Sequence, residues 1–492
     1  MQNLIALLLA VATIAGLSLG FLLAFNYPMT SDTANAGLFP MEVMHGNFEY
    51  VFPANNPYFF TDYVFHLVIQ PLTGYSPVAL ILTGYAMFVL IVLASAALAL
   101  RLAGRLEALA AAALVANTSF WSLKYVLYPL YHNGTILFIL LSILVIYADR
   151  PPFRLGFRTR VLIVTLLQFL GVFSDTLMLP VFTLPLIVYS AYRLWKQRHA
   201  AEEEKKSNDT EGSPLFWLAS TVPALVIFAL KTRMGQIWPG GPILEQGADL
   251  ASPGSLLQHP EMLNVAVDTL IRFSGDIIVA ALIVIAIALV ILGRKDRFLQ
   301  AVLVLGGIFM VIGLMSMTVV GNAGRYLTSI IVLALTVAAT GTMRRGLYYV
   351  PLIIVFAIVL LNIGSNVQLL NQPHPNFLQD QQGMVDYLES KNITHAYSDY
   401  WTANINTYVS GGKITVEPVY LQDGLLRFQN TNSAPRWASV WPDGNDTRPV
   451  LITRPGDRIY DWAQQVNKDH PPVEAYQVND CRIYVYNGTL PT

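Results

Sequence analysis

Residues 77–99 read PVALILTGYAMFVLIVLASAALA and contain no charged side chain, and this stretch decides the fold class. An α-helix rises about 1.5 Å per residue, so about 20 apolar residues cross the hydrocarbon core of a bilayer. The stretch is therefore predicted to be a membrane-spanning helix.

Similar apolar stretches recur over most of the chain. Of the 492 residues, 54% are hydrophobic and only 12% are charged, whereas a soluble domain carries roughly 25% charged residues. The sequence predicts a polytopic α-helical membrane protein with about eleven transmembrane helices. The predicted spans lie near residues 2–25, 77–99, 104–120, 134–148, 160–174, 177–192, 215–231, 276–293, 299–319, 326–342 and 347–364.

The distribution of basic residues predicts the orientation of these spans. Cytoplasmic loops collect Lys and Arg, and alternate loops hold sixteen of the 30 basic residues when the N-terminus is placed in the cytoplasm. We expect a cytoplasmic N-terminus, an exported C-terminus and a location in the plasma membrane. The first span lacks a basic segment before it and a clean cleavage site, so we interpret it as a retained helix rather than a signal peptide.

The chain is predicted to consist of a transmembrane module, residues 1–364, and a tail. Within the module, the long outer loop 27–76 is expected to carry interfacial helices, and residues 193–214 are expected to form a cytoplasmic linker. Residues 365–492 form an extracytoplasmic α/β domain. Within this tail, residues 377–390 predict a helix, and residues 473–487 predict a hairpin that turns at Asn479 and Asp480.

The net charge excludes a nucleic-acid partner, and the cysteine content excludes one kind of metal site. The formal net charge is −1, so the chain has no basic field to hold a nucleic acid. Cys481 is the single cysteine, which excludes a zinc site built from several thiolates. Membrane lipids are the partners that the apolar composition predicts.

Ionisable residues avoid the centres of the predicted spans and gather at their outer ends. A proton- or ion-coupled transporter would place some of them at mid-depth, where a charge is costly and therefore functional. We expect any chemistry to occur at the outer membrane surface. The outer residues are Asp32, Glu42, Asp62, Lys124, His132, Asp175, Lys231, Arg233, Asp268, Arg272, Asp276 and Arg325.

Basic residues at headgroup depth suit a lipid phosphate, because charge-assisted hydrogen bonds to its oxygens are strong. Arg325, in GNAGRYLTSIIVLAL, is the best candidate, followed by Lys124. The alternative is that these side chains extend to ordinary anionic headgroups, and this alternative is favoured for Lys231, Arg233 and Arg272.

Two interpretations are open for each candidate acidic or aromatic residue. Asp32 either caps the helix that follows it or accepts a proton from a hydroxyl nucleophile. Asp175 has the same ambiguity, and His132 is either an interfacial hydrogen-bonding residue or a catalyst. In the tail, Asp399 and Trp401 either line a carbohydrate cleft or form a turn and core.

Taken together, the layout and several short motifs resemble the GT-C superfamily of polytopic glycosyltransferases, which includes protein O-mannosyltransferases and the lipid A aminoarabinose transferase. The motifs are SDTANAGLFPMEVMHGNFEY in the first outer loop, YHNGTILFILLSILVI, LGVFSDTLMLPVFTLPL, GRYLTSIIVLAL and the tail segment GMVDYLESKNITHAYSDYWTANINTYVSGGKITVEPVY. The chain departs from the paired acidic residues of many members, because Thr33 follows Asp32.

The resemblance implies a sugar transfer from a polyprenyl-phosphate donor to an acceptor hydroxyl of a glycan, lipid or protein, on the outer face and with inversion. It implies that Asp32 is the catalytic base, and that no metal or other cofactor is required. The implied phosphate-binding residues are Arg325, Lys124, Arg272 and Lys231. The implied sugar- or acceptor-binding residues are Glu42, Asp62, His132, Asp175, Asp399 and Trp401.

Three alternatives remain. A glycan ligase or polymerase would use a diphosphate-linked lipid and would also gather cations at the outer surface. A lipid or glycan transporter is disfavoured by the empty span centres and by the lack of internal repeats. A non-enzymatic scaffold would leave the acidic first loop and the outer cations without a purpose.

Overall fold

The structure is a computed structural model, and it describes most of the chain. The described residues are 2–26, 30–44, 46, 58–74, 76–119, 127–128, 132–149, 154–199, 213–237, 297–315, 323–341, 349–372, 377–428 and 448–488. They belong to two compact units. The helical unit comprises Met1–Ala24, Pro57–Asp62 and Gly84–Gln372, and the mixed unit comprises Phe25–Asn56, Tyr63–Thr83 and Pro373–Thr492.

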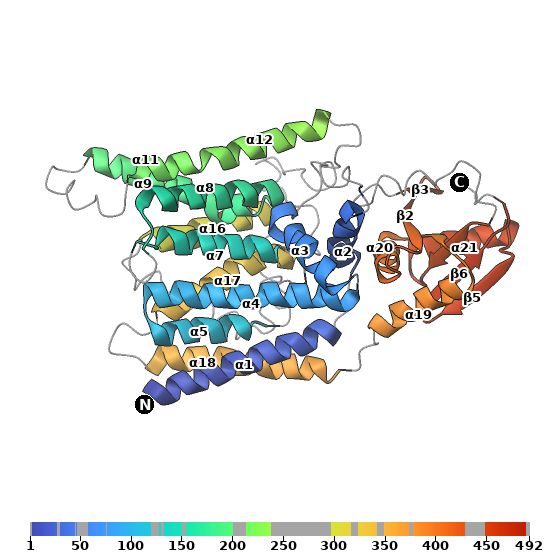
Figure 1. The fold of residues 1–492 in the computed structure, drawn as a ribbon, viewed down its shortest axis with the longest axis horizontal. Helices are drawn as coiled ribbons and strands as arrows, with labels where there is room; N and C mark the ends of the chain where they lie inside the picture. The colour runs from blue at the N-terminus through green and yellow to red at the C-terminus, as the bar shows by residue number, and fades with distance from the viewer. Residues whose placement is uncertain are drawn as a thin grey trace. The chain divides into compact units, whose positions relative to one another are not determined.

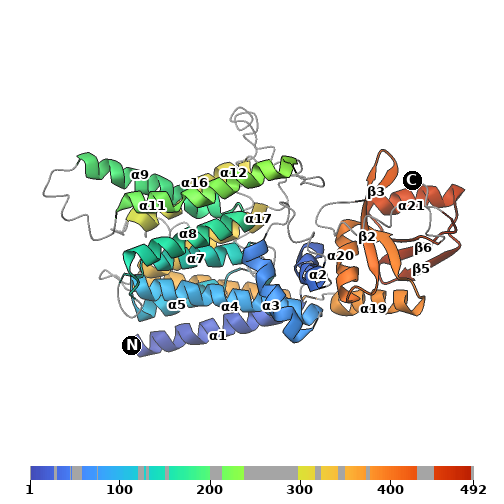
Figure 2. The same cartoon turned by 45° about the horizontal axis from the view of Figure 1, so that its top comes forward.

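The helical unit is built from apolar helices, with α7 beside α8, as Figures 1 and 2 show. Helix α17 packs against α5. Each predicted span within the described residues coincides with helix, whereas residues 276–293 lie outside them, so the count of eleven stays a prediction. The elements are α1 Gln2–Asn26, η2 Phe59–Tyr63, α4 Pro77–Leu102, α5 Arg105–Ala116, α7 Asn133–Ile146, α8 Phe157–Ser174, η3 Leu179–Thr183, α9 Leu184–His199, α11 Pro214–Ser220, α12 Val222–Ile237, α16 Arg297–Met315, α17 Ala323–Gly341 and α18 Tyr349–Leu370.

Four of the described helices are long and apolar enough to cross a membrane: α1, α4, α8 and the part of α18 from Leu352 to Leu370. Lipid tails offer no hydrogen-bond partners, so the backbone N–H and C=O groups of each spanning helix must bond within the helix. Arg101 Nε donates to Tyr147 O at 2.8 Å and Arg160 Nη1 donates to Ile146 O at 2.6 Å. Two cations thus occupy the negative end of α7.

Two helices extend further than the sequence predicts. Helix α18 continues to Leu370, beyond the predicted end at residue 364, and its buried Asn366 donates to Thr118 O at 3.2 Å. Helix α9 continues to His199, and therefore into the predicted linker 193–214, with basic residues in its last turn. In both cases polar residues that look unsuited to a span are accommodated by a hydrogen bond or by the helix dipole.

The mixed unit contains a six-stranded sheet in the order β3-β2-β1-β4-β6-β5. Strand β1 is parallel to β2 and β4, with Tyr397 opposite Leu451, and the remaining pairs are antiparallel. The elements are α2 Ser31–Met44, α3 Val64–Thr73, α19 Phe377–Ser390, β1 His395–Ser398, α20 Tyr400–Val409, β2 Thr415–Gln422, β3 Leu425–Phe428, β4 Val450–Thr453, α21 Arg458–Asp469, β5 Glu474–Val478 and β6 Cys481–Val485.

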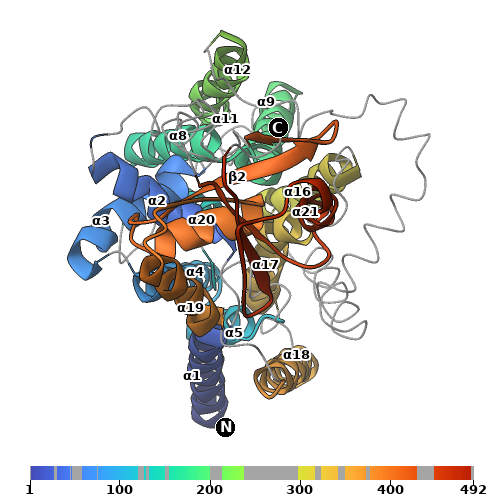
Figure 3. The same cartoon turned by 90° about the vertical axis from the view of Figure 1, so that its right-hand side faces the viewer.

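Helices cover both faces of this sheet. Successive side chains of a strand point to opposite faces, and here both faces carry apolar residues that pack against helices. Ala396 and Ile452 pack with residues of α19 and α20, whereas Tyr397 and Leu451 pack with residues of α21. Figure 3 shows α19 and α20 on one side of the strands and α21 on the other. The expected α/β tail is confirmed for the described residues, and the predicted hairpin turn lies between β5 and β6.

Candidate active site

Asp32 lies in the first turn of α2. The helix begins at Ser31, and the backbone N–H of Thr33 donates to Thr30 Oγ1 at 3.4 Å. Thr30 therefore supplies a capping oxygen for α2. A carboxylate in the first turn is also favoured by the positive end of the helix dipole.

The tail supplies a direct partner for Asp32. Tyr400, the first residue of α20, donates its phenolic hydrogen to Asp32 Oδ1 at 2.7 Å. Asn35 Nδ2 donates to the Tyr400 oxygen at 3.1 Å, and Asn404 Nδ2 donates to Asn35 Oδ1 at 2.9 Å. Asn35, Tyr400 and Asn404 are buried, so this chain of hydrogen bonds is shielded from water and ends on the carboxylate.

Helices α2 and α20 approach each other closely beside this network. Gly37 faces the ring of Tyr408, and a Cβ atom at position 37 would overlap that ring. Tyr408 donates to Ser76 O at 3.0 Å and accepts from Gln70 Nε2 at 2.7 Å. The glycine thus permits the contact that brings Tyr400 to Asp32.

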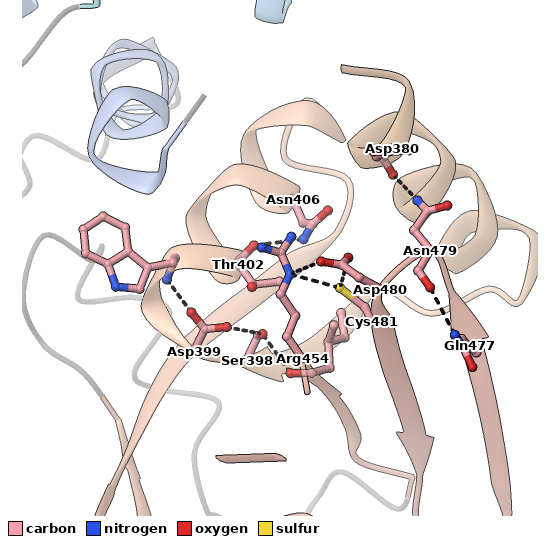
Figure 4. A network of polar contacts seen from close by, with 12 residues as sticks. Asp380, Ser398, Asp399, Thr402, Asn406, Arg454, Gln477, Asn479, Asp480 and Cys481 are labelled. Atoms are coloured by element: carbon pink, nitrogen blue, oxygen red, sulfur yellow. Dashed lines mark hydrogen bonds and ion pairs between the residues drawn. The ribbon is translucent and has the colours of Figure 1, made fainter. Parts of the chain in front are cut away.

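The tail residues Asp399 and Trp401 flank Tyr400. Asp399 caps α20, because its Oδ1 accepts from Trp401 N at 2.8 Å, and its Oδ2 accepts from Ser398 Oγ at 3.4 Å (Figure 4). Trp401 is 54% exposed, and its ring meets the Tyr400 ring edge-on with centroids 5.2 Å apart. Asp399 thus has a structural role, whereas Trp401 presents an exposed aromatic face next to the residue that binds Asp32.

Charged residues gather near Asp399 at the carboxyl ends of β1 and β4, as Figure 4 shows. Arg454 Nε lies 3.6 Å from Asp480 Oδ2 and 3.4 Å from Cys481 Sγ. Burial and the nearby Asp399 raise the pKa of Asp457, although Arg454 opposes the shift. Arg454, Asp480 and Cys481 are thus paired with one another.

Two other predicted acidic residues are buried. Glu42 lies on α2, in the mixed unit with Asp32, whereas Asp62 lies on η2 in the helical unit. Both side chains are 0% exposed. Burial of a carboxylate requires a compensating partner, so both positions are more constrained than surface acids.

His132 and Asp175 form a buried pair in the helical unit. His132 Nδ1 lies 2.6 Å from Asp175 Oδ2, and Thr135 Oγ1 donates to the same oxygen at 2.6 Å. Leu177 N donates to Asp175 Oδ1 at 2.9 Å. Burial acts to raise the pKa of Asp175, but the interaction with His132 and these hydrogen bonds outweigh burial and hold it below its usual value.

The aromatic part of the outer loop is attached to this pair. Tyr58 Oη lies 3.4 Å from His132 Nε2, and Ser174 O accepts from Tyr58 N at 2.7 Å. The rings of His132 and Tyr326 lie 4.8 Å apart. The pair therefore connects α7, the start of η2 and the first turns of α17.

The structure does not describe the side chains of the four predicted phosphate-binding residues. Arg325 is in the first turn of α17 and Lys231 is in α12, but their side chains lie outside the described residues. Lys124 and Arg272 lie outside them entirely. Within the residues that are described, no three His, Cys, Asp or Glu side chains are grouped so as to hold a metal ion.

The sequence does not indicate the hydrogen-bond partners of these residues. Tyr400 stands in SDYW between two named candidates, but it contacts a residue 368 positions away. Asn35 and Thr135 are ordinary polar residues on predicted helices. No local pattern indicates such contacts, because they depend on how distant segments pack.

The described residues form a multi-pass helical protein with an α/β tail, and solved structures share this fold. The structure superposes on ArnT from Cupriavidus metallidurans bound to undecaprenyl phosphate with a TM-score of 0.62 and 12% sequence identity. The match covers 96% of this chain and 97% of that one. The apo state of the same protein matches with a TM-score of 0.60 and 10% identity, over the same shares of the two chains.

A lower similarity is found to the archaeal oligosaccharyltransferase AglB from Archaeoglobus fulgidus, with a TM-score of 0.45 and 12% identity, over 91% of this chain and 69% of that one. The fold assignment rests on the two ArnT structures. No protein-family model and no curated protein matches the sequence. The similarity over nearly the whole of both chains shows that this chain has the ArnT fold, as expected from the resemblance of its motifs.

Proposed function

We propose that the chain is a membrane glycosyltransferase that moves a sugar from a polyprenyl-phosphate donor to an acceptor hydroxyl on the extracytoplasmic face. The observation that carries this proposal is Asp32, held by a buried hydrogen-bond network in a chain that has the ArnT fold over 96% of its length. The bound undecaprenyl phosphate of that ArnT structure supports a lipid-phosphate donor here. The membrane orientation proposed is a cytoplasmic N-terminus and an exported tail, in the plasma membrane.

In the proposed reaction, Asp32 accepts the proton of the acceptor hydroxyl as the oxygen attacks the anomeric carbon. The bond between this carbon and the phosphate oxygen breaks, and polyprenyl phosphate leaves from the opposite face, so the configuration inverts. Arg325 and Lys124, with Arg272 and Lys231, would stabilise the charge on the leaving phosphate. A phosphate monoester is a good leaving group, and we propose that the transfer requires no metal.

The remaining candidates would bind the sugar or the acceptor. Trp401 supports this proposal best, because its exposed ring adjoins Tyr400 and suits the apolar face of a sugar. Glu42 and Asp62 would do so from buried positions. His132, Asp175 and Asp399 are the other candidates for contact with the sugar or the acceptor.

Purified protein in detergent, incubated with a panel of polyprenyl-phosphate sugars and candidate acceptors, tests the proposal. We expect wild-type protein to consume one donor, and the variant Asp32→Asn to lose at least 100-fold in kcat, as removal of a general base does. Asp386→Asn, which changes an exposed carboxylate of α19, is the matched control and should turn over normally.

Three results would each contradict a part of the proposal. Turnover that survives Asp32→Asn would exclude Asp32 as the base, and turnover of diphosphate-linked donors alone would favour a ligase or polymerase. Loss of activity in chelator with rescue by Mn²⁺ would contradict metal independence.

A further inference from the structure

The hydrogen bonds that reach Asp32 run in a single direction. Asn404 donates to Asn35, Asn35 donates to Tyr400, and Tyr400 donates to the carboxylate. Each donor in such a chain polarises the next group, so the final bond to an ionised acceptor is strengthened. The Tyr400 oxygen accepts from Asn35, and its own hydrogen points to Asp32 Oδ1.

The position of Tyr400 is fixed from several sides. It is 9% exposed, it follows the capping residue Asp399, and it stands on the helix that packs against α2 at Gly37. A side chain held by packing and by second hydrogen bonds restricts its partner to one rotamer, which is what a catalytic group requires.

We infer that Tyr400 is a positioning residue for the catalytic base, so that α20 of the tail supplies part of the active centre. This inference rests on the proposed function. During transfer the proton of the acceptor hydroxyl moves to Asp32, while Tyr400 keeps its own proton and maintains the orientation of the carboxylate. The tail is therefore a component of the catalytic apparatus and not only a docking module for the acceptor.

The helix α20 contains its own matched control. Tyr408 is also buried on α20, also contacts α2 and also takes part in two hydrogen bonds, but these go to Gln70 and Ser76 and not to Asp32. Tyr400→Phe and Tyr408→Phe each remove one phenolic oxygen and leave the ring in place. A purely structural role predicts similar effects of the two substitutions.

Steady-state turnover of the consumed donor separates the two roles. We expect Tyr400→Phe to lower kcat by about 10–100-fold, which corresponds to one lost hydrogen bond to a charged group. Donor affinity and the thermal unfolding midpoint should stay close to those of Tyr408→Phe, whose kcat should stay within about threefold of wild type. In the Asp32→Asn background, Tyr400→Phe should cause no further loss, because the two residues act as one unit.

The outcomes distinguish this inference from the proposed function. Turnover that Asp32→Asn abolishes but that Tyr400→Phe and Tyr408→Phe lower equally overturns the inference and leaves the proposed function intact. Independent, additive losses from Asp32→Asn and Tyr400→Phe overturn it as well. A wild-type protein that consumes no donor overturns both.

Discussion

The burial of His66 leads to a prediction about the pH dependence of stability, which does not depend on any enzymatic role. It lies on α3, it is fully buried, and neither ring nitrogen has a hydrogen-bond partner among the described residues. Burial lowers the pKa of His66 from 6.5 to about 3. The ring is therefore neutral in the folded protein at neutral pH.

The stability of the mixed unit should fall in mild acid because of His66. Between pH 6.5 and about 3 the unfolded chain binds a proton that the folded chain does not. Stability is therefore present above pH 6.5 and decreases as the pH falls, by about 1.4 kcal/mol per pH unit. The variant His66→Leu should flatten this dependence in thermal unfolding scans between pH 7.5 and 5.

The control for this experiment is His470→Gln, because His470 is exposed at the end of α21. It should leave the pH dependence unchanged. A wild-type protein whose unfolding midpoint is as flat as that of His66→Leu would show that His66 does not titrate in this way.

Asp32 shows how far a single residue can be predicted from sequence. Its place in the acidic first loop is sufficient to nominate it as a candidate base. The local sequence alone does not decide between a helix cap and a base. In the structure, Thr30 Oγ1 accepts from the backbone N–H of Thr33 at the start of α2. Its hydrogen bond to Tyr400 could not be predicted, because 368 residues separate the two and no local pattern connects them.

At the scale of elements, the contact between α2 and α20 depends on one small residue. Gly37 allows the ring of Tyr408 to pack directly against the α2 backbone, and this ring is fully buried and hydrogen-bonded at its far end. The ring has no alternative position without breaking those bonds. The contact is therefore sensitive to a single added methyl group.

Gly37→Ala should destabilise this contact by about 1–3 kcal/mol, as overpacking of a filled site does, and should lower turnover because α2 carries Asp32. Gly383→Ala on α19 is the control, since no atom lies within 4 Å of its added Cβ and alanine is the better helix former. Thermal unfolding followed by tryptophan fluorescence measures both variants. Equal midpoints would show that the two helices do not pack as described.

Elements were more predictable than contacts. The described spans coincide with apolar stretches because a helix in lipid must be apolar on most of its surface. Their ends were less predictable, since Asn366 and the basic residues of α9 stay helical through a hydrogen bond or the helix dipole. Of the tail, the hairpin at Asn479 was predictable because its turn chemistry is local.

At the scale of the whole molecule, most of the first outer loop and the tail belong to one compact unit, although α4 and many other helices separate them in sequence. Sequence composition alone divides the chain at the last span, because it registers polarity and not packing. The grouping of α2 and α3 with the α/β tail explains how a tail residue reaches Asp32.

The proposed orientation can be tested by cysteine labelling, because the natural chain provides a clean background. Cys481 is 3% exposed, and burial raises the pKa of its thiol to about 11, so it should react slowly with maleimides. In intact cells, a membrane-impermeant maleimide should label Lys413→Cys in the tail. It should label Arg198→Cys at the end of α9 only after permeabilisation. The reverse pattern would contradict the orientation.

The central claim is that the chain cleaves a sugar from a polyprenyl monophosphate, and identification of the released lipid by mass spectrometry tests it most directly. With wild-type protein, one donor of the panel and its acceptor, we predict equimolar polyprenyl phosphate and glycosylated acceptor, and neither product with Asp32→Asn. Release of polyprenyl diphosphate, or movement of the intact lipid across a vesicle membrane without bond cleavage, would contradict the account.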